Sequence, residues 1–120
     1  MEEYAILKDV SLITYTVADL GAAKRFFGAL IGSDPYVDSP QYVGYKSDDM
    51  EIGLVPRGDK RDPGAVPFWT VSDIAASVKS LVAAGGTVTQ EIMDVGYGLQ
   101  VASVKDPNGA VVGLRQFPKG

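Results

Sequence analysis

The feature that most constrains the fold is a motif that occurs twice in the chain. The segment 15–23 reads YTVADLGAA, and the segment 69–77 reads WTVSDIAAS. Aligned at Asp19 and Asp73, which are 54 residues apart (73 − 19), the copies keep the residue type at eight successive positions. Each copy is a β-branched run, an Asp and an alanine-rich run, which predicts a strand leading into a helix with the Asp as N-cap. A repeated supersecondary unit predicts two similar modules.

The ends of the two modules also match. Gly53-Leu54 closes the first and Gly113-Leu114 the second, 60 residues later, and loops absorb the six extra residues cheaply. Hydrophobic periodicity and turn residues then predict the same order, βαβββ, in each half. The first module is predicted as strand 10–17, helix 19–31 and strands 34–37, 41–46 and 50–55. The second is predicted as strand 66–71, helix 73–84 and strands 87–92, 99–105 and 110–116.

This pattern predicts an α+β fold in which two tandem βαβββ modules form a curved, half-open mixed sheet. One helix covers only one sheet face of a module, so the other face must curve over a ligand, a partner chain or the other module. With 120 residues the chain is predicted to be a single domain, with module one at about 10–55 and module two at about 66–116. The segment 56–65, rich in Pro, Gly and charge, is predicted to be a solvated, mobile connection.

Composition excludes several functions. The net charge is −4 and there is no run of Lys or Arg, so nucleic acid is not an expected partner. No apolar run approaches the roughly 20 residues of a membrane helix, and no targeting motif is seen, which predicts a cytoplasmic protein. The chain has no histidine and no cysteine, which excludes imidazole and thiol catalysis and soft metal sites. A metal site would have only oxygen ligands.

Two motifs carry a family resemblance. The first strand leads into Asp-Leu-x-Ala-Ala-x-x-Phe-Phe at 19–27, and Asp-Pro-Asn-Gly at 106–109 lies near the end. With the doubled architecture, these motifs resemble the vicinal oxygen chelate superfamily, which includes glyoxalase I, extradiol dioxygenases and the bleomycin-resistance proteins. The resemblance covers about residues 10–116.

The resemblance also implies where a metal would be bound. In the metal-dependent enzymes of this family, one ligand lies seven residues before the Asp of each module, which gives Leu12 and Val66 here. The other is a carboxylate on the last strand, which aligns with Gly53 and Gly113. None of the four has a coordinating side chain, and Glu51 is a single carboxylate on the strand face of Gly53. The resemblance therefore implies no metal and no cofactor, as in the antibiotic-binding resistance proteins, which are dimers with clefts between two chains.

The candidate ligand-binding residues come from the predicted uncovered face and its surroundings. Phe68 either stacks on a ligand ring or fills the barrel. Glu51 and Arg115 pair with each other, fix polar ends of a ligand, or form a solvated rim. Tyr15 and Trp69 point at the helices as core, with a ligand platform as the alternative for the aromatic pair. The polar-tipped residues Gln100, Tyr42 and Tyr97 either line a cleft or belong to the ordinary surface. The predicted ligand-binding residues are Phe68, Glu51, Arg115, Thr14, Thr70, Gln100, Tyr42, Tyr97 and Trp69.

The resulting hypothesis is a metal-independent, dimeric protein that sequesters an apolar or aromatic small molecule, such as an antibiotic, in a concave cleft. The enzyme alternative is a lyase or isomerase of glyoxalase type, with a divalent cation held by Glu51 and by backbone or partner oxygens. A third alternative, a regulatory or structural partner module, predicts a filled barrel without a pocket.

Overall fold

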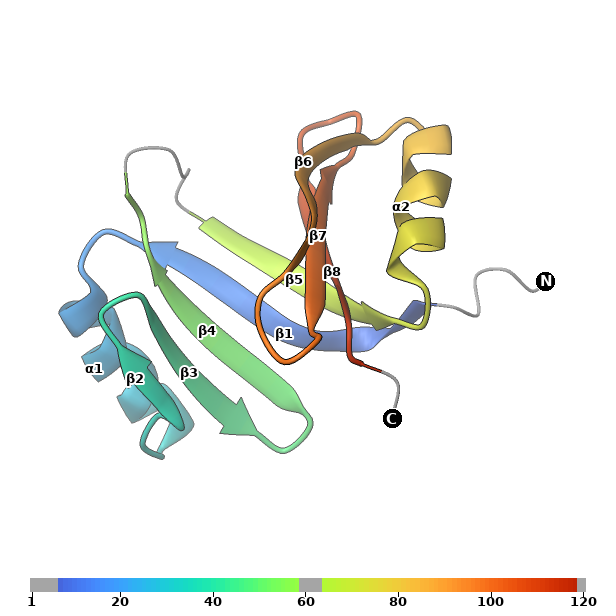
Figure 1. The fold of residues 1–120 in the computed structure, drawn as a ribbon. Coiled ribbons are helices and arrows are strands. Elements are labelled where there is room, and N and C mark those ends of the chain that lie inside the picture. Colours follow the sequence, from blue (N-terminus) through green and yellow to red (C-terminus); the bar gives the residue numbers. More distant parts are fainter. Residues whose placement is uncertain (1–6, 59–63, 119–120) are drawn as a thin grey trace. The chain divides into compact units, whose positions relative to one another are not determined.

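The computed structural model describes residues 7–58 and 64–118. The chain divides into two compact units, an N-terminal unit, Ser11–Val66, and a C-terminal unit, Pro67–Gly120 together with the first ten residues. Each unit holds one helix and its own set of strands (Figure 1). The predicted lead-in before residue 7 and the centre of the predicted connection, 59–63, lie outside the described residues.

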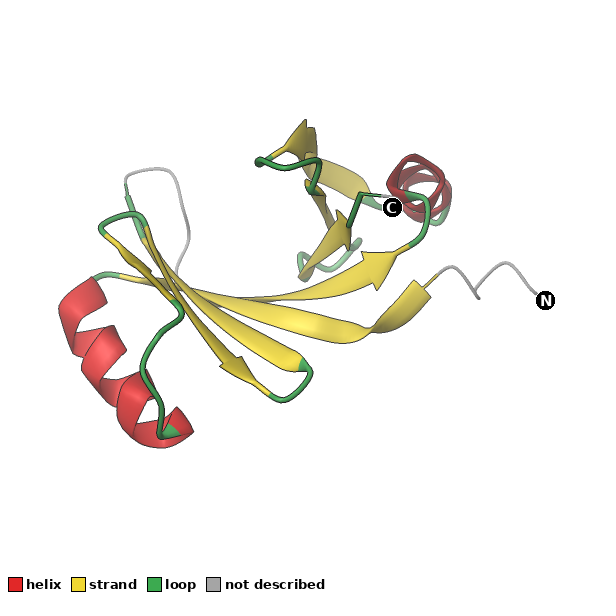
Figure 2. Cartoon of the chain, turned by 60° about the horizontal axis from the view of Figure 1, so that its bottom comes forward, coloured by secondary structure: helices red, strands yellow, loops and turns green. Residues whose placement is uncertain are grey.

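The N-terminal unit has the predicted βαβββ order. Its elements are β1 (Leu7–Val17), which enters this unit at Ser11, α1 (Leu20–Ile31), β2 (Val37–Ser39), β3 (Tyr42–Ser47) and β4 (Met50–Pro56). The strands lie in the order β2-β3-β4-β1, with β4 parallel to β1 and the other neighbours antiparallel. The sheet is therefore mixed, and α1 covers one of its faces (Figure 2).

The C-terminal unit repeats this order. Its elements are β5 (Gly64–Val71), α2 (Ile74–Ala83), β6 (Thr87–Asp94), β7 (Gln100–Lys105) and β8 (Val111–Gln116). The strands lie in the order β5-β8-β7-β6, again with one parallel neighbour pair, β5 and β8. The predicted α+β class with two βαβββ modules is confirmed.

The strand register shows how closely the second unit repeats the first. Thr14 lies opposite Gly53 on β1 and β4, and Phe68 lies opposite Gly113 on β5 and β8. These pairs are related by the offsets 54 and 60 found in the sequence. The repeat therefore extends from the motif to the pairing of the strands.

Both helices begin as predicted. The Asp19 carboxylate accepts from the backbone N–H of Ala22 at 2.9 Å, and Asp73 does the same for Ala76 at 3.0 Å. These bonds satisfy backbone donors that have no partner inside a helix. α1 ends at Gly32, whose φ of 81° is left-handed, a conformation that favours glycine.

Each core lies between helix and sheet. In the N-terminal unit Val43, Tyr45 and Leu54 are buried, and Tyr15 packs against them. In the C-terminal unit Trp69 packs against a cluster of Val71, Ile74, Ala102 and Leu114. The prediction that Tyr15 and Trp69 point at the helices is confirmed.

Several predicted boundaries are wrong. β2 is Val37–Ser39 rather than 34–37, because the segment after the Gly32 cap is still turning and a proline at 35 cannot donate to a ladder. β1 begins at Leu7 and β5 at Gly64, both earlier than alternation alone suggested. β6 runs to Asp94, so the glycine-rich loop is 95–99. No helix among the described residues is long and apolar enough to cross a membrane.

Candidate functional site

The sheet face that the helix leaves uncovered is the candidate binding surface in each unit. Side chains alternate between faces along a strand, so Tyr15, Tyr45 and Leu54 on the helix side place their neighbours on the other side. In the N-terminal unit the uncovered face therefore carries Thr14 and Gly53. In the C-terminal unit Leu114 belongs to the α2 core, so Gly113 and Arg115 lie on the uncovered face.

In the N-terminal unit the Tyr42 ring lies over Gly53. A Cβ added at Gly53 would lie 2.3 Å from the Tyr42 hydroxyl oxygen and 2.7 Å from two ring carbons, closer than real atoms approach. Gly44, the cross-strand partner of Gly53, is close to the rings of both Tyr42 and Tyr36. The two glycines thus make room for two tyrosine rings on one face.

One of these tyrosines, Tyr36, contacts two charged side chains. The Tyr36 hydroxyl donates to the Glu51 carboxylate, and the Lys46 ammonium lies 4.8 Å from the centre of the Tyr36 ring. Lys46 and Glu51 are also cross-strand partners on β3 and β4. The predicted candidates Tyr42 and Glu51 therefore lie in one polar aromatic cluster with Tyr36 and Lys46, which the sequence analysis missed. Tyr36 fell within the strand predicted at 34–37, but it precedes β2 in the structure, and local pattern does not show that it contacts Glu51 and Lys46 on β4 and β3.

In the C-terminal unit the Phe68 ring lies over Gly113. A Cβ added at Gly113 would lie 2.4 Å from two carbons of the Phe68 ring and 2.6 Å from a third. Phe68 and Gly113 are direct partners on β5 and β8, so the ring packs onto the neighbouring backbone. The last strand of each unit thus carries a glycine beneath an aromatic ring.

Arg115 is two residues beyond Gly113 on the same face. Its side chain is buried, with only 6% exposed, and it lies opposite Thr70 on β5. The guanidinium carbon is 4.9 Å from the centre of the half-exposed Phe117 ring, which is a cation–π arrangement. The predicted candidates Phe68, Thr70 and Arg115 therefore lie together. Phe117 was missed because it follows the end of β8.

The remaining predicted candidates lie in three different places. Trp69 packs in the α2 core, and Gln100 shares the parity of the core residue Ala102, so both lie on the helix side. Tyr97 is fully exposed in the loop between β6 and β7, with a positive φ of 56°. Thr14 lies opposite Gly53 on the uncovered face. The candidate site therefore consists of residues on the uncovered faces, and it excludes Trp69 and Gln100.

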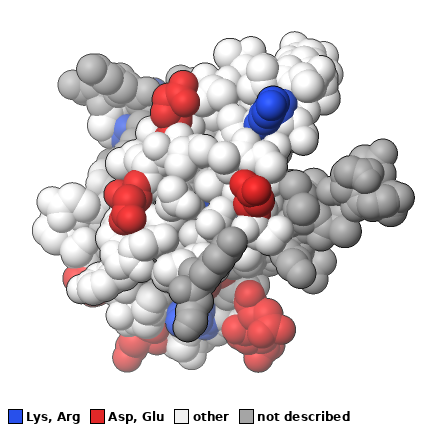
Figure 3. All heavy atoms as spheres, turned by 45° about the vertical axis from the view of Figure 1, so that its right-hand side comes forward, with Lys and Arg blue, Asp and Glu red and all other residues white. Residues whose placement is uncertain are grey.

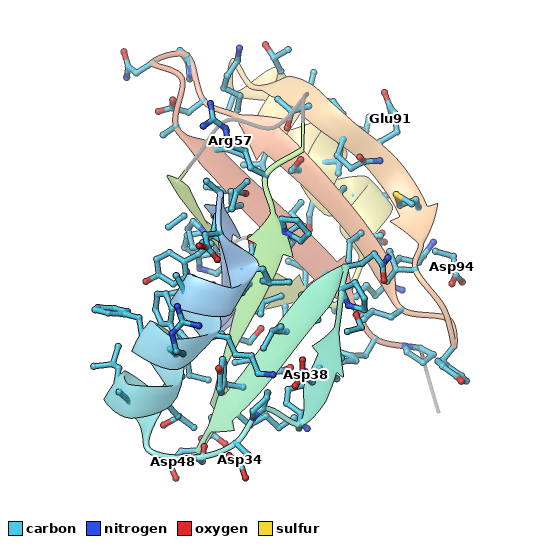
Figure 4. The ribbon with its side chains drawn as sticks, turned by 90° about the vertical axis from the view of Figure 1, so that its left-hand side faces the viewer. Asp34, Asp38, Asp48, Arg57, Glu91 and Asp94 are labelled. Atoms are coloured by element: carbon cyan, nitrogen blue, oxygen red, sulfur yellow. The ribbon has the colours of Figure 1, made fainter. Side chains whose placement is uncertain are left out.

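A separate open pocket lies on the helix side of the N-terminal unit. Its volume is about 550 Å³, and it runs between α1 and the segment after Gly32, with Lys24, Arg25, Asp34 and Tyr45 in its lining. No predicted site residue lines it. Lys24 binds Asp38, which raises the pKa of Lys24, and Figure 4 shows Asp38 beside α1.

The Tyr45 phenol at the base of this pocket is fully buried. Its hydroxyl donates to the Lys24 carbonyl at 2.9 Å, and burial raises its pKa. A protonated phenol is therefore favoured at this position, where it ties β3 to α1. Tyr45 thus stabilises the unit and also lines the pocket.

Charge and donor types limit what the site binds. Figure 3 shows acidic and basic side chains scattered over one face, without a continuous basic patch. Among the described residues, no three His, Cys, Asp or Glu side chains gather as a metal site would require. The positions to which the resemblance assigns metal ligands hold Leu12, Val66, Gly53 and Gly113, whose side chains have no donor atom. These residues do not fit the metal of the metal-dependent enzymes.

Comparisons with known proteins place the fold. A methylmalonyl-CoA epimerase from Mycobacterium tuberculosis superposes with a TM-score of 0.72 at 18% identity, covering 99% of this chain and 94% of that chain. A glyoxalase/bleomycin resistance protein/dioxygenase superfamily member from Vibrio splendidus 12B01 superposes with a TM-score of 0.65 at 18% identity, covering 88% and 95%. At these identities the likeness shows the fold alone.

Sequence comparison adds closer relatives and a family. The protein CFP32 of Mycobacterium bovis and of Mycobacterium tuberculosis, provisionally named a glyoxylase, is 31% identical over 109 residues, which is 82% of this chain. The match spans 41% of the length of these relatives, so the chain corresponds to about two fifths of each. The family model for the Glyoxalase/Bleomycin resistance protein/Dioxygenase superfamily matches residues 10–114. The chain belongs to the Glyoxalase/Bleomycin resistance protein/Dioxygenase superfamily.

Proposed function

We propose that this chain is a metal-independent small-molecule-binding protein that holds an apolar or aromatic ligand, such as an antibiotic, on its helix-free sheet faces. We further propose that it acts as a cytoplasmic homodimer whose second copy completes the cleft. One observation carries the proposal. An aromatic ring covers each of the two glycines that stand where the family resemblance assigns a metal-binding carboxylate.

The rings give positions 53 and 113 an apolar aromatic surface in place of a metal-binding carboxylate. A carboxylate side chain at residue 53 or 113 would need its first carbon in space that the Tyr42 or Phe68 ring already fills. A ring packed against backbone on one side presents its opposite side as a flat surface, and aromatic pairs contribute about 0.5–1.5 kcal/mol beyond the burial of area. The arrangement therefore favours a planar or apolar ligand over a chelated one.

Isothermal titration with planar aromatic and cationic glycopeptide antibiotics tests the proposal. We expect binding that weakens in Phe68→Ala or Tyr42→Ala. Phe26→Ala is the matched control, because Phe26 is 65% exposed on α1, away from the uncovered face. Absence of binding across the whole panel, or equal losses in the control, would contradict the proposal. Light scattering of the purified chain tests the dimer.

A glyoxalase-type lyase or isomerase is the second candidate, and the name of the mycobacterial relatives favours it. In this chain it requires a divalent cation held by Glu51 and by oxygens other than those of the four expected positions. Metal analysis of the purified protein and an assay with a hemithioacetal distinguish the two. A stoichiometric divalent ion, with turnover that Glu51→Gln abolishes, would replace our proposal by this one.

A further inference from the structure

We propose that the open pocket beside α1 binds a short zwitterionic peptide, with the peptide carboxylate at Arg25 and its ammonium group at Asp34. This pocket lies on the helix side of the N-terminal unit, so it is a second site, separate from the helix-free sheet faces. The proposal depends on the space beside α1, on the charges of the pocket walls and on their separation along the helix.

The first step is the space that the glycines of α1 leave. The pocket has a volume of about 550 Å³, and Gly21 and Gly28 lie on its α1 wall. Apart from chain neighbours and the helix backbone, the nearest described atom to a Cβ added at Gly28 is the Tyr45 hydroxyl oxygen, at 3.7 Å. At Gly21 the nearest is an Asp19 carboxylate oxygen, at 3.6 Å. Both are ordinary contacts, so packing within the described chain does not require glycine at either position.

The second step is the cost of a glycine at position 28. Glycine inside a helix is less favourable than alanine, because more backbone freedom is lost when it is ordered. At the offset of 54, Gly28 corresponds to Val82 of α2, so the same helix forms with a larger side chain there. Helix formation and packing therefore both leave Gly28 unexplained, whereas an occupant of the pocket accounts for it.

The third step is the charge of the pocket walls. Arg25 lies on the α1 wall and Asp34 on the wall formed by the segment after the helix. Among residues 7–58 and 64–118, neither side chain makes a hydrogen bond or an ion pair. Lys24, the other cation in the lining, binds Asp38. The pocket thus offers a ligand one cation and one anion, which complement a carboxylate and an ammonium group.

The fourth step is the orientation of the ligand. Asp34 lies beyond the C-terminal end of α1 (Figure 4), where the helix dipole is negative and the last turn holds no basic residue. This end favours the ammonium group. Nη1 of Arg25 extends toward the other end, 3.8 Å from a Cβ added at Gly21. The Asp19 carboxylate at that end already accepts from the N–H of Ala22, so Arg25 is the group available to a carboxylate.

The fifth step is the length of the ligand. Arg25 and Gly32 both line the pocket and are seven residues apart, which is about 10 Å along the helix axis. An extended chain of three residues spans at most about 10 Å. A tripeptide therefore reaches both charges. A single amino acid, whose two charged groups are attached to one carbon, does not.

The test uses three peptides: trialanine with both ends free, N-acetyl-trialanine without the ammonium group, and trialanine amide without the carboxylate. NMR titration at about pH 7, where both free ends are mostly charged, gives affinities and locates the site. We expect trialanine to bind at least about threefold more tightly than either capped peptide, the size of a charge pair open to solvent on one side. Amide signals of α1 and of residues 32–35 should shift.

Charge variants assign the two ends of the ligand. In Arg25→Gln the preference for trialanine over its amide should disappear. In Asp34→Asn the preference over N-acetyl-trialanine should disappear. Lys79→Gln removes the cation at the corresponding position of α2 and should keep both preferences. Loss of either preference in Lys79→Gln would contradict the assignment.

Size variants test the space. Gly28→Val introduces the residue that α2 carries at this position and should weaken trialanine binding at least about fivefold. Ala29→Val adds bulk at the next, exposed position outside the lining and should leave binding unchanged. Gly28→Ala should raise the midpoint of chemical denaturation while weakening binding, which a purely structural role of Gly28 would not produce. Unchanged binding in both Gly28 variants would overturn the proposal.

The remaining outcomes separate this site from the proposed function. If the capped peptides bind as tightly as trialanine, or if trialanine does not bind at about 10 mM, the peptide site is wrong. Neither result affects binding on the helix-free faces, which the antibiotic titration decides. Likewise, a failure of that titration leaves the peptide test intact, because no residue of the helix-free faces is altered in it.

Discussion

In the N-terminal unit the ring over the last-strand glycine comes from β3, as Tyr42, whereas in the C-terminal unit it comes from β5, as Phe68. The backbone register beneath the two rings is the same. The comparison shows that the repeat conserves how strands pair and caps are made, while the side chains on the uncovered face differ. One face carries the Tyr36–Glu51 pair, and the other carries Arg115.

The helix-side cores differ as well. Tyr45 lies opposite Ile52, and Val104 lies opposite Val112 at the corresponding place of the second unit. Both Tyr45 and Val104 are buried, but only Tyr45 brings a hydroxyl that must find an acceptor. The same backbone thus accepts a hydrogen-bonded tyrosine or a small aliphatic side chain.

The largest expected effect is a difference in stability loss when each of the two last-strand glycines is replaced by alanine. Gly113→Ala should lower the free energy of unfolding by about 1–3 kcal/mol, because the Phe68 atoms in the way include the ring carbon nearest the backbone. Gly53→Ala should cost less than about 1 kcal/mol, because it meets the far end of Tyr42, which can swing away. Chemical denaturation measures both.

A double-mutant cycle with Phe68→Leu and Gly113→Ala checks the cause. If the ring is responsible, the loss from Gly113→Ala should be smaller in the Phe68→Leu background. Equal losses at Gly53 and Gly113 would remove the distinction between the two faces.

The next effect concerns the helix caps. Asp19→Ala and Asp73→Ala should each lower the free energy of unfolding by about 1 kcal/mol. The loss should be greater at Asp19, since the Gln116 side chain also accepts from the first N–H of α2, at Ile74. Thermal and chemical denaturation measure the two variants, and Asp→Asn at each site, which keeps the cap, should stay close to the unmodified protein.

The third effect is a loss of stability at alkaline pH that we expect to begin in the N-terminal unit. Lys24 and Tyr45 both have raised pKa values in the folded N-terminal unit, so their contribution to stability is complete below about pH 10 and is lost as pH rises through the folded values. Tyr45→Phe should cost about 1 kcal/mol near neutral pH and should reduce the alkaline loss.

Denaturation at about pH 8 and about pH 11 makes this measurement. Local amide exchange would show whether the N-terminal unit responds first, as expected because its core holds Tyr45 where the corresponding position of the C-terminal unit holds Val104. An alkaline loss of equal size in Tyr45→Phe would show that the phenol is not its source.

The smallest effect concerns a position of the repeat at which the two units hold different residues, so that each unit serves as a control for the other. Ser77 on α2 corresponds to Ala23 on α1, and its buried hydroxyl has no hydrogen-bond partner among the described residues. Ser77→Ala should raise the free energy of unfolding by up to about 1 kcal/mol, because it removes an unsatisfied buried group. The reverse change, Ala23→Ser, should lower it. A stability loss in Ser77→Ala would show that the hydroxyl is satisfied.

Much of the fold followed from local sequence. Asp19 and Asp73 marked both helix starts and Gly32 marked a helix end, because caps depend on one or two residues and their nearest backbone groups. Alternation placed Tyr15 and Trp69 on the helix sides, because successive side chains of a strand point to opposite faces of the sheet. Strand ends such as those of β2 and β6 were misplaced, because a ladder ends where its partner ends, which local pattern does not contain.

The sequence by itself determined the doubled βαβββ order, the superfamily and the absence of donor atoms at Leu12, Val66, Gly53 and Gly113, since these depend on residue identity and spacing alone. Only the tertiary structure decided that Tyr42 and Phe68 cover the two glycines, that Tyr36 joins Glu51, and that Phe117 stacks on Arg115. These contacts depend on side-chain rotamers and on which strands become neighbours when the chain packs. The periodicity along one strand does not contain this information.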